Sequence, residues 1–140
     1  MSLPLTKSIV LLDDEKSYTE LMCQLLSDGL DCPVHGFNRP LAALEALPAI
    51  KPGMVITDYF MPQIDGLEFI RRASPVVPGA SFLIITGHNL TAHQEELGRL
   101  TALRSVMGKP FGWRKLADEI LRHWPAGLPT PCPRAAEPSL

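Results

Sequence analysis

Acidic, hydroxyl and basic side chains stand at four points of this sequence, and each point closes a short apolar run. The residues are Asp13 and Asp14, Asp58, Thr86, and Lys109. Because the carboxyl ends of parallel strands meet at one edge of an open α/β sheet, we expect these side chains to converge. Three carboxylates in one crevice repel one another unless a cation joins them, and oxygen ligands of this kind suit Mg²⁺. Together with a lysine and a hydroxyl, they indicate phosphoryl transfer to a free carboxylate.

The spacing of apolar residues along the chain changes repeatedly between the pattern of a buried strand and that of a helix. Continuous apolar runs predict strands at about 9–12, 32–37, 54–58, 81–85 and 105–107. Each run is followed by apolar residues at helical spacing, as in the first helix with Tyr18, Met22 and Leu26. Strand and helix therefore alternate five times, which predicts an α/β fold with a parallel sheet and helices on both faces.

Turn and capping residues predict where several helices begin and end. We expect Asn38 to cap the second helix and Pro48 to close it. Thr91 with Gln94 resembles a capping box, and it would open a helix that carries leucines 97, 100 and 103. The last helix is expected to carry an apolar stripe over 113–124. The pair at 65–66, Asp-Gly, is interpreted as a structural turn.

Composition excludes several classes of function. The chain has 140 residues, 46% hydrophobic, with a net charge of −2 and a pI near 6.1. We therefore expect one domain, with neither a nucleic-acid footprint nor a membrane-spanning segment. Three cysteines form no disulfide framework, and the N-terminus lacks a signal-peptide pattern, so a cytoplasmic protein is expected. We divide the chain into an extension (1–6), a domain (7–124) and a proline-rich tail (125–140) expected to be disordered and outside the core.

The ordered set of motifs at these strand ends resembles the receiver domain of two-component response regulators. The motifs are Asp13-Asp14, then Asp58 with Met61-Pro62 and Asp65-Gly66, Thr86-Gly87-His88, and Lys109-Pro110-Phe111. Each fragment alone has an ordinary structural interpretation, and their joint order over residues 7–124 carries the resemblance. It implies a flavodoxin-like, doubly wound five-stranded parallel sheet of order 2-1-3-4-5.

The resemblance also implies a role for each site residue. Asp58 would accept a phosphoryl group from a sensor histidine kinase or a histidine phosphotransfer protein. Asp14, Asp58 and the backbone carbonyl of Phe60 would bind Mg²⁺ directly, and Asp13 through a metal-bound water. Thr86 and Lys109 would sense the phosphoryl group. The helix near residue 91, the strand at 105–107 and the last helix would form the face that contacts a downstream protein target.

Three positions depart from the family's usual pattern or tune it. Val106 stands three residues before Lys109, where an aromatic residue commonly reports the phosphorylation state. A β-branched aliphatic side chain has no comparable swing. Phe60 and His88 are expected to flank the path of the hydrolytic water and to set the lifetime of the phosphoryl group. Pro110 is interpreted as positional, with a cis bond as one way to orient the lysine.

Other functions stay open beside the phosphorylated switch. The chain could be a receiver-like interaction module that is never phosphorylated, or the receiver part of a larger regulator that carries an effector. A phosphatase with an aspartyl-phosphate intermediate is disfavoured, because the segment after Asp58 lacks a second acid. Flavin binding is disfavoured by the acids at 13–14, which would repel a phosphate. We expect no enzyme activity beyond its own phosphorylation and dephosphorylation, and homodimerisation is left open.

Overall fold

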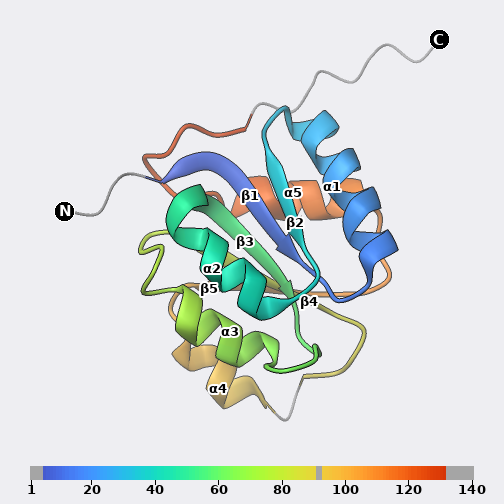
Figure 1. The fold of residues 1–140 in the computed structure, drawn as a ribbon, viewed down its shortest axis with the longest axis vertical. Coiled ribbons are helices and arrows are strands. Elements are labelled where there is room, and N and C mark those ends of the chain that lie inside the picture. Colours follow the sequence, from blue (N-terminus) through green and yellow to red (C-terminus); the bar gives the residue numbers. More distant parts are fainter. Residues whose placement is uncertain (1–4, 91–92, 132–140) are drawn as a thin grey trace.

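Strands and helices alternate along the chain in the computed structural model, which describes residues 5–90 and 93–131 (Figure 1). The elements are β1 (Thr6–Leu12), α1 (Lys16–Leu30), β2 (Val34–Phe37), α2 (Pro40–Ile50), β3 (Pro52–Asp58), α3 (Gly66–Ala73), β4 (Ser81–Thr86), α4 (Gln94–Arg99), β5 (Leu103–Gly108) and α5 (Trp113–Arg122). The five strands pair in parallel in the order β2-β1-β3-β4-β5. The predicted α/β fold and strand order are confirmed.

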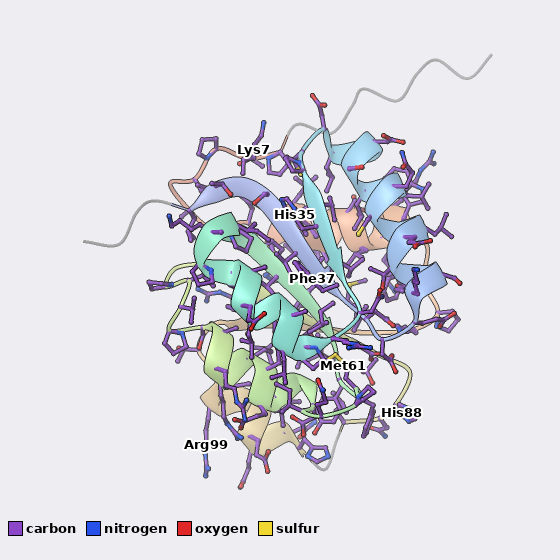
Figure 2. All side chains as sticks on the ribbon, viewed as in Figure 1. Lys7, His35, Phe37, Met61, His88 and Arg99 are labelled. Carbon is purple, nitrogen blue, oxygen red and sulfur yellow. The ribbon has the colours of Figure 1, made fainter. Side chains whose placement is uncertain are left out.

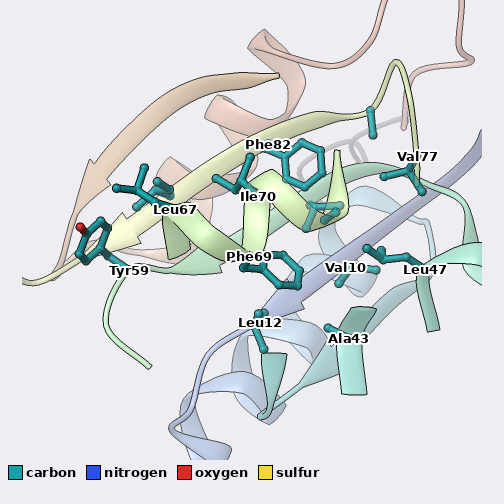
Figure 3. Close-up of a cluster of buried hydrophobic side chains, with 14 of the residues drawn as sticks. Val10, Leu12, Ala43, Leu47, Tyr59, Leu67, Phe69, Ile70, Val77 and Phe82 are labelled. Carbon is teal, nitrogen blue, oxygen red and sulfur yellow. The ribbon is translucent and has the colours of Figure 1, made fainter. Parts of the chain in front are cut away.

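The central strands are buried on both faces, which explains why the sequence shows no alternation there. Along β1, Val10 and Leu12 face a core that α2 and α3 cover, while Ile9 and Leu11 face a second core beneath α1 and α5. In Figure 3 the ring of Phe69 from α3 lies over β1 in the middle of the first core. The sheet is thereby fixed between two helical layers, so the ends of its strands form a stable base for a site.

The boundaries of α2 differ from those predicted. The residue that precedes the helix is Arg39, and the side chain of Asn38 caps nothing. Instead, Asn38 donates hydrogen bonds to the backbone oxygen of Asp13 (3.0 Å) and to Thr19 Oγ1 (3.1 Å). Pro48 lies inside the helix, which ends where Lys51 adopts a left-handed conformation with φ of 50°. A proline removes one hydrogen bond near the end of a helix, and here this is not enough to stop it.

The fourth helix is shorter than its leucine pattern predicts. Its proposed cap, Thr91, lies outside the described residues, and α4 ends at Arg99. Leu103, expected on the helix, is the first residue of β5 and pairs with Phe82 of β4. Pairing with β4 thus overrides the local helical spacing. None of the residues of α4 itself, all of them described, is buried, so this helix is held to the domain only weakly.

Both ends of the domain differ from the expected boundaries. β1 begins at Thr6, inside the segment assigned to the extension. After α5, residues 125–131, which we term the closing segment, fold back onto the domain: Trp124 Nε1 donates to the backbone oxygen of Pro129 (3.0 Å), and Pro131 is buried. A Cβ placed on Gly53 of β3 would lie 2.5 Å from Leu128. Leu128 of this segment packs beside Gly53 of β3, so residues 125–131 differ from the expected tail outside the core. Cys132 and the residues after it lie outside the described part.

Candidate functional site

Four strands deliver the predicted residues to one edge of the sheet. Asp13 follows β1, Asp58 ends β3, Thr86 ends β4 and Lys109 follows β5. The pairing of β3 with β4 and of β4 with β5 sets these ends side by side, since Asp58 stands opposite residue 85 and Thr86 opposite residue 108. In Figure 2 the labelled Met61 and His88 lie toward this end of the molecule, and Lys7 lies at the opposite end. The structure therefore brings together the residues that the sequence predicted to converge.

Three carboxylates form the centre of the site, and we term them the acid cluster: Asp13, Asp14 and Asp58. One oxygen from each lies within 4.8 Å of the others. Asp13 is fully buried and Asp58 is 9% exposed, while Asp14 is exposed. Backbone N–H groups hold one oxygen of each buried acid: Glu15 donates to Asp13 Oδ1 (2.9 Å) and Tyr59 donates to Asp58 Oδ1 (2.8 Å). The Oδ2 atoms of Asp13 and Asp58 are therefore the ones that face a cation.

Lys109 supplies one positive charge to this cluster. Its Nζ lies 2.6 Å from Asp13 Oδ2 and 3.6 Å from Asp58 Oδ2. Burial lowers the pKa of Lys109, but the hydrogen bond and charge of Asp13, with a further contribution from Asp58, raise it overall. Burial raises the pKa of Asp58, Asp13 and Asp14 raise it further, and Lys109 and the Tyr59 amide oppose this only in part. Asp58 is therefore an incompletely compensated carboxylate, which a further cation would stabilise.

Backbone contacts fix the two remaining strand ends. Thr86 is buried, and its Oγ1 accepts a hydrogen bond from the backbone N–H of His88 (3.0 Å). The backbone N–H of Lys109 donates to the oxygen of Thr86 (2.7 Å), and the bond to Pro110 is cis. Gly66 packs against the backbone of Asp58. A Cβ at position 66 would lie 2.8 Å from the backbone oxygen of Asp58, which explains why glycine is needed there.

Aromatic rings form one rim of the site. Phe60 is 48% exposed, and its ring meets that of His88 edge to face with centroids 4.5 Å apart. The rings of Tyr59 and Phe60 also meet edge to face, with centroids 4.6 Å apart. The structure thus brings both proposed tuning residues into contact with each other. Val106 lies on β5 and is 42% exposed.

Sequence reasoning missed two residues that support the site. Tyr18 was assigned only to the core stripe of α1, yet its ring lies under Lys109, with Nζ 4.6 Å from the ring centroid. Asn38 was assigned as a helix cap, yet it binds the backbone of Asp13. The signal for Tyr18 was its position one helical turn after Asp14, which keeps it at the same end of the sheet.

Comparisons with known proteins identify this arrangement. Residues 9–121 match the response regulator receiver domain family. The response regulator receiver protein CpdR of Brucella abortus is 29% identical over 114 residues, covering 81% of this chain and 93% of that protein. The transcriptional regulatory protein FixJ of Bradyrhizobium diazoefficiens is 32% identical over 103 residues, covering 74% of this chain and 49% of that protein.

Solved structures show the same fold. A Vibrio cholerae chemotaxis protein superposes with a TM-score of 0.76 at 19% identity, covering 84% of this chain and 98% of that chain. Among the described residues, no helix is long and apolar enough to cross a membrane. The chain spans nearly all of CpdR but only about half of FixJ, so family membership concerns the domain. This chain belongs to the response regulator receiver domain family, whose members act in two-component signalling.

Proposed function

We propose that this chain is a phosphorylatable switch that accepts a phosphoryl group on Asp58. The observation that carries the proposal is the incompletely compensated Asp58 carboxylate, with Lys109 Nζ at 3.6 Å and the other two acids within 4.8 Å. A carboxylate oxygen attacks phosphorus of a phosphohistidine, the O–P bond forms as the N–P bond breaks, and the departing imidazole takes up a proton. The donor is a sensor histidine kinase or a histidine phosphotransfer protein.

The acid cluster fits a bound Mg²⁺. Its donors are carboxylate oxygens, the ligands that Mg²⁺ prefers, and like charges at such short range favour a cation between them. Asp14, Asp58 and the backbone carbonyl of Phe60 would bind the ion directly, with Asp13 acting through water. The ion would neutralise charge on the acids and on the phosphoryl oxygens.

The remaining side chains hold and read the phosphoryl group. Lys109 supplies a compact ammonium. Thr86 Oγ1 accepts from the His88 amide and can donate its own proton to a phosphoryl oxygen at the same time. A phosphoryl group that draws Thr86 and Lys109 toward itself would pull the β4–α4 loop inward, and α4, with none of its described residues buried, is free to follow. The face formed by α4, β5 and α5 then contacts a downstream protein target or a second copy. Val106 gives this face no aromatic reporter.

We place the switch in the cytoplasm, where histidine kinases present their phosphoryl groups, and assign it no enzyme activity beyond its own phosphorylation and dephosphorylation. In place of the expected bounds 1–6, 7–124 and 125–140, we propose a receiver domain that begins with β1 and includes the closing segment. FixJ, of which the chain covers 49%, favours a second arrangement in which this receiver is one part of a larger regulator. An unphosphorylated interaction module is the remaining alternative, and exposed Val106 is the feature that favours it.

Intact-mass spectrometry after incubation with acetyl phosphate and Mg²⁺ tests the proposal. We expect one phosphoryl adduct that is absent without Mg²⁺ and absent in Asp58→Asn. Asp118→Asn is the matched control, because Asp118 is exposed on α5 and does not belong to the acid cluster, and it should keep the adduct. An adduct that persists in Asp58→Asn, or no adduct in the native chain, contradicts the assignment.

A further inference from the structure

The ammonium group of Lys109 has a third neighbour besides the two acids. Its Nζ lies 2.6 Å from Asp13 and 3.6 Å from Asp58, and the ring of Tyr18 faces it at 4.6 Å. A lysine side chain is flexible and carries about 2 kcal/mol of rotamer entropy. Carboxylates alone would leave the ammonium free to turn toward either acid or toward solvent. The face of the Tyr18 ring lies on a further side of the ammonium and so limits where the Lys109 nitrogen can move.

The ring of Tyr18 is held by its helix and not by its hydroxyl group. The start of α1 is pinned where Thr19 Oγ1 donates to the backbone oxygens of Asp13 and Glu15, each at 3.0 Å. Tyr18 also packs against the core between the sheet and α1. Its Oη is buried and has no hydrogen-bond partner among the described residues. The hydroxyl group therefore contributes nothing that would orient the ring.

The attraction between Tyr18 and Lys109 is that of a neutral ring for a cation. Burial raises the pKa of Tyr18 to about 12, and the charges of Asp13 and Asp58 add to this. The phenol is accordingly protonated at neutral pH and forms no ion pair with the lysine. What faces Nζ is the negative potential of the aromatic face, which phenylalanine would supply as well and leucine would not.

We propose that Tyr18 is a positioning residue for Lys109, holding the ammonium on its ring face as it moves from Asp13 toward a phosphoryl oxygen on Asp58. The inference rests on the proposed function for its consequence, because only the phosphorylated site needs this movement. The distances of 2.6 Å and 3.6 Å to the two Oδ2 atoms show that Nζ starts on the Asp13 side. A broad aromatic face accommodates such a displacement without losing contact with the cation.

Two variants separate the ring from the hydroxyl group. Tyr18→Phe keeps the aromatic face, and Tyr18→Leu keeps apolar volume without it. Leu21→Ala is the control, because Leu21 lies on the same helix and is 59% exposed. Circular dichroism establishes that each variant folds, and a titration with Mg²⁺ followed by the Asp58 amide resonance should give the same affinity in all. A residue with a merely structural role would not produce a difference between Phe and Leu in the two measurements that follow.

The first measurement is the proton chemical shift of the Lys109 ε-methylene in the unphosphorylated protein. A ring current should displace it upfield in the native chain, in Tyr18→Phe and in Leu21→Ala, and the displacement should vanish in Tyr18→Leu. The second is the rate at which acetyl phosphate with Mg²⁺ forms the adduct. A cation–π contact of ordinary strength predicts that Tyr18→Leu slows this rate about three- to tenfold, whereas Tyr18→Phe stays within about twofold of native.

Each outcome decides the inference. A normal ε-methylene shift in the native chain overturns it, as does an equal loss of rate in Phe and Leu, which would assign the effect to the hydroxyl group. Equal rates in all variants overturn it as well. If the native chain forms no adduct at all, the proposed function fails, and the ring-current shift still decides whether Tyr18 holds Lys109.

Discussion

Replacing Asp58 with asparagine should stabilise the folded domain in the absence of Mg²⁺. At an effective dielectric constant of 20, opposite charges at the 3.6 Å between Lys109 and Asp58 attract by about 4.6 kcal/mol. Like charges at the 4.8 Å limit of the acid cluster repel by about 3.5 kcal/mol per pair. The attraction of Lys109 for Asp58 thus offsets roughly the repulsion from one of the other two acids, Asp13 or Asp14. Burial of the carboxylate and the charge of exposed Asp14 are left uncompensated.

The expected gain in the free energy of unfolding is about 1–3 kcal/mol, the range for relieving a buried polar group that lacks full compensation. Asparagine fits the site, because its Oδ1 can still accept the Tyr59 amide. Urea titrations at neutral pH with a chelator measure the difference, and Asp118→Asn is the exposed control. With Mg²⁺ at 100 times its dissociation constant, the native domain should recover about 2.7 kcal/mol, and the variant less, because a ligand has been removed.

The pH dependence follows from the raised pKa of Asp58. A carboxyl group whose pKa rises on folding favours the folded state only while it is protonated, and this contribution is lost as pH rises through the folded pKa. The stability difference between Asp58→Asn and the native chain should therefore be small in acid and widen toward neutral pH. A variant that is less stable than the native chain without Mg²⁺, or a difference that does not change with pH, would refute this account of the site.

Three further predictions concern other parts of the domain. Lys109→Met should lower the free energy of unfolding by about 3 kcal/mol, because it leaves Asp13 buried without its partner, and Mg²⁺ should restore part of the loss. Gly53→Ala should destabilise by about 1–3 kcal/mol through overlap with the closing segment, measured by urea titration against Gly98→Ala, whose added Cβ meets nothing within 4 Å. Phe60→Ala should shorten the lifetime of the phosphoryl adduct about two- to tenfold, because it removes the edge-to-face contact with His88. Mass spectrometry follows the decay of the adduct, and an unchanged lifetime would show that Phe60 does not tune it.

The site was predictable from the sequence because each of its chemical residues ends a strand. A buried parallel strand is a continuous apolar run, and the first polar residue after it must lie at the edge of the sheet. Asp13 and Thr86 satisfy this rule directly, and Asp58 is the first charged residue of its strand, after buried Thr57; parallel pairing then makes the strand ends neighbours. Neither the strand order nor their convergence depends on the details of the helices between them.

The helix boundaries were not predictable in the same way, because distant contacts decide them. Leu103 continues a helical pattern, yet it becomes part of β5 because β4 offers a pairing edge. Asn38 has the chemistry of a cap, yet Asp13 and Thr19 offer it two partners from other segments. The closing segment has the composition of a disordered tail, yet Gly53 leaves room for Leu128 to pack against β3.

Tyr18 shows how one residue can belong to the core and to the site at once. Its spacing correctly placed it on the buried face of α1, but the first turn of that face lies beside the acid cluster. The apolar stripe of α1 therefore runs directly into the site, because two of the carboxylates are themselves buried. Burial makes the negative charge of Asp58 unfavourable in the resting domain. The same burial strengthens the interaction of the site with a bound cation or phosphoryl group, since charges interact more strongly away from water. A domain more stable at rest, as expected for Asp58→Asn, should on this reasoning be a domain that can no longer respond.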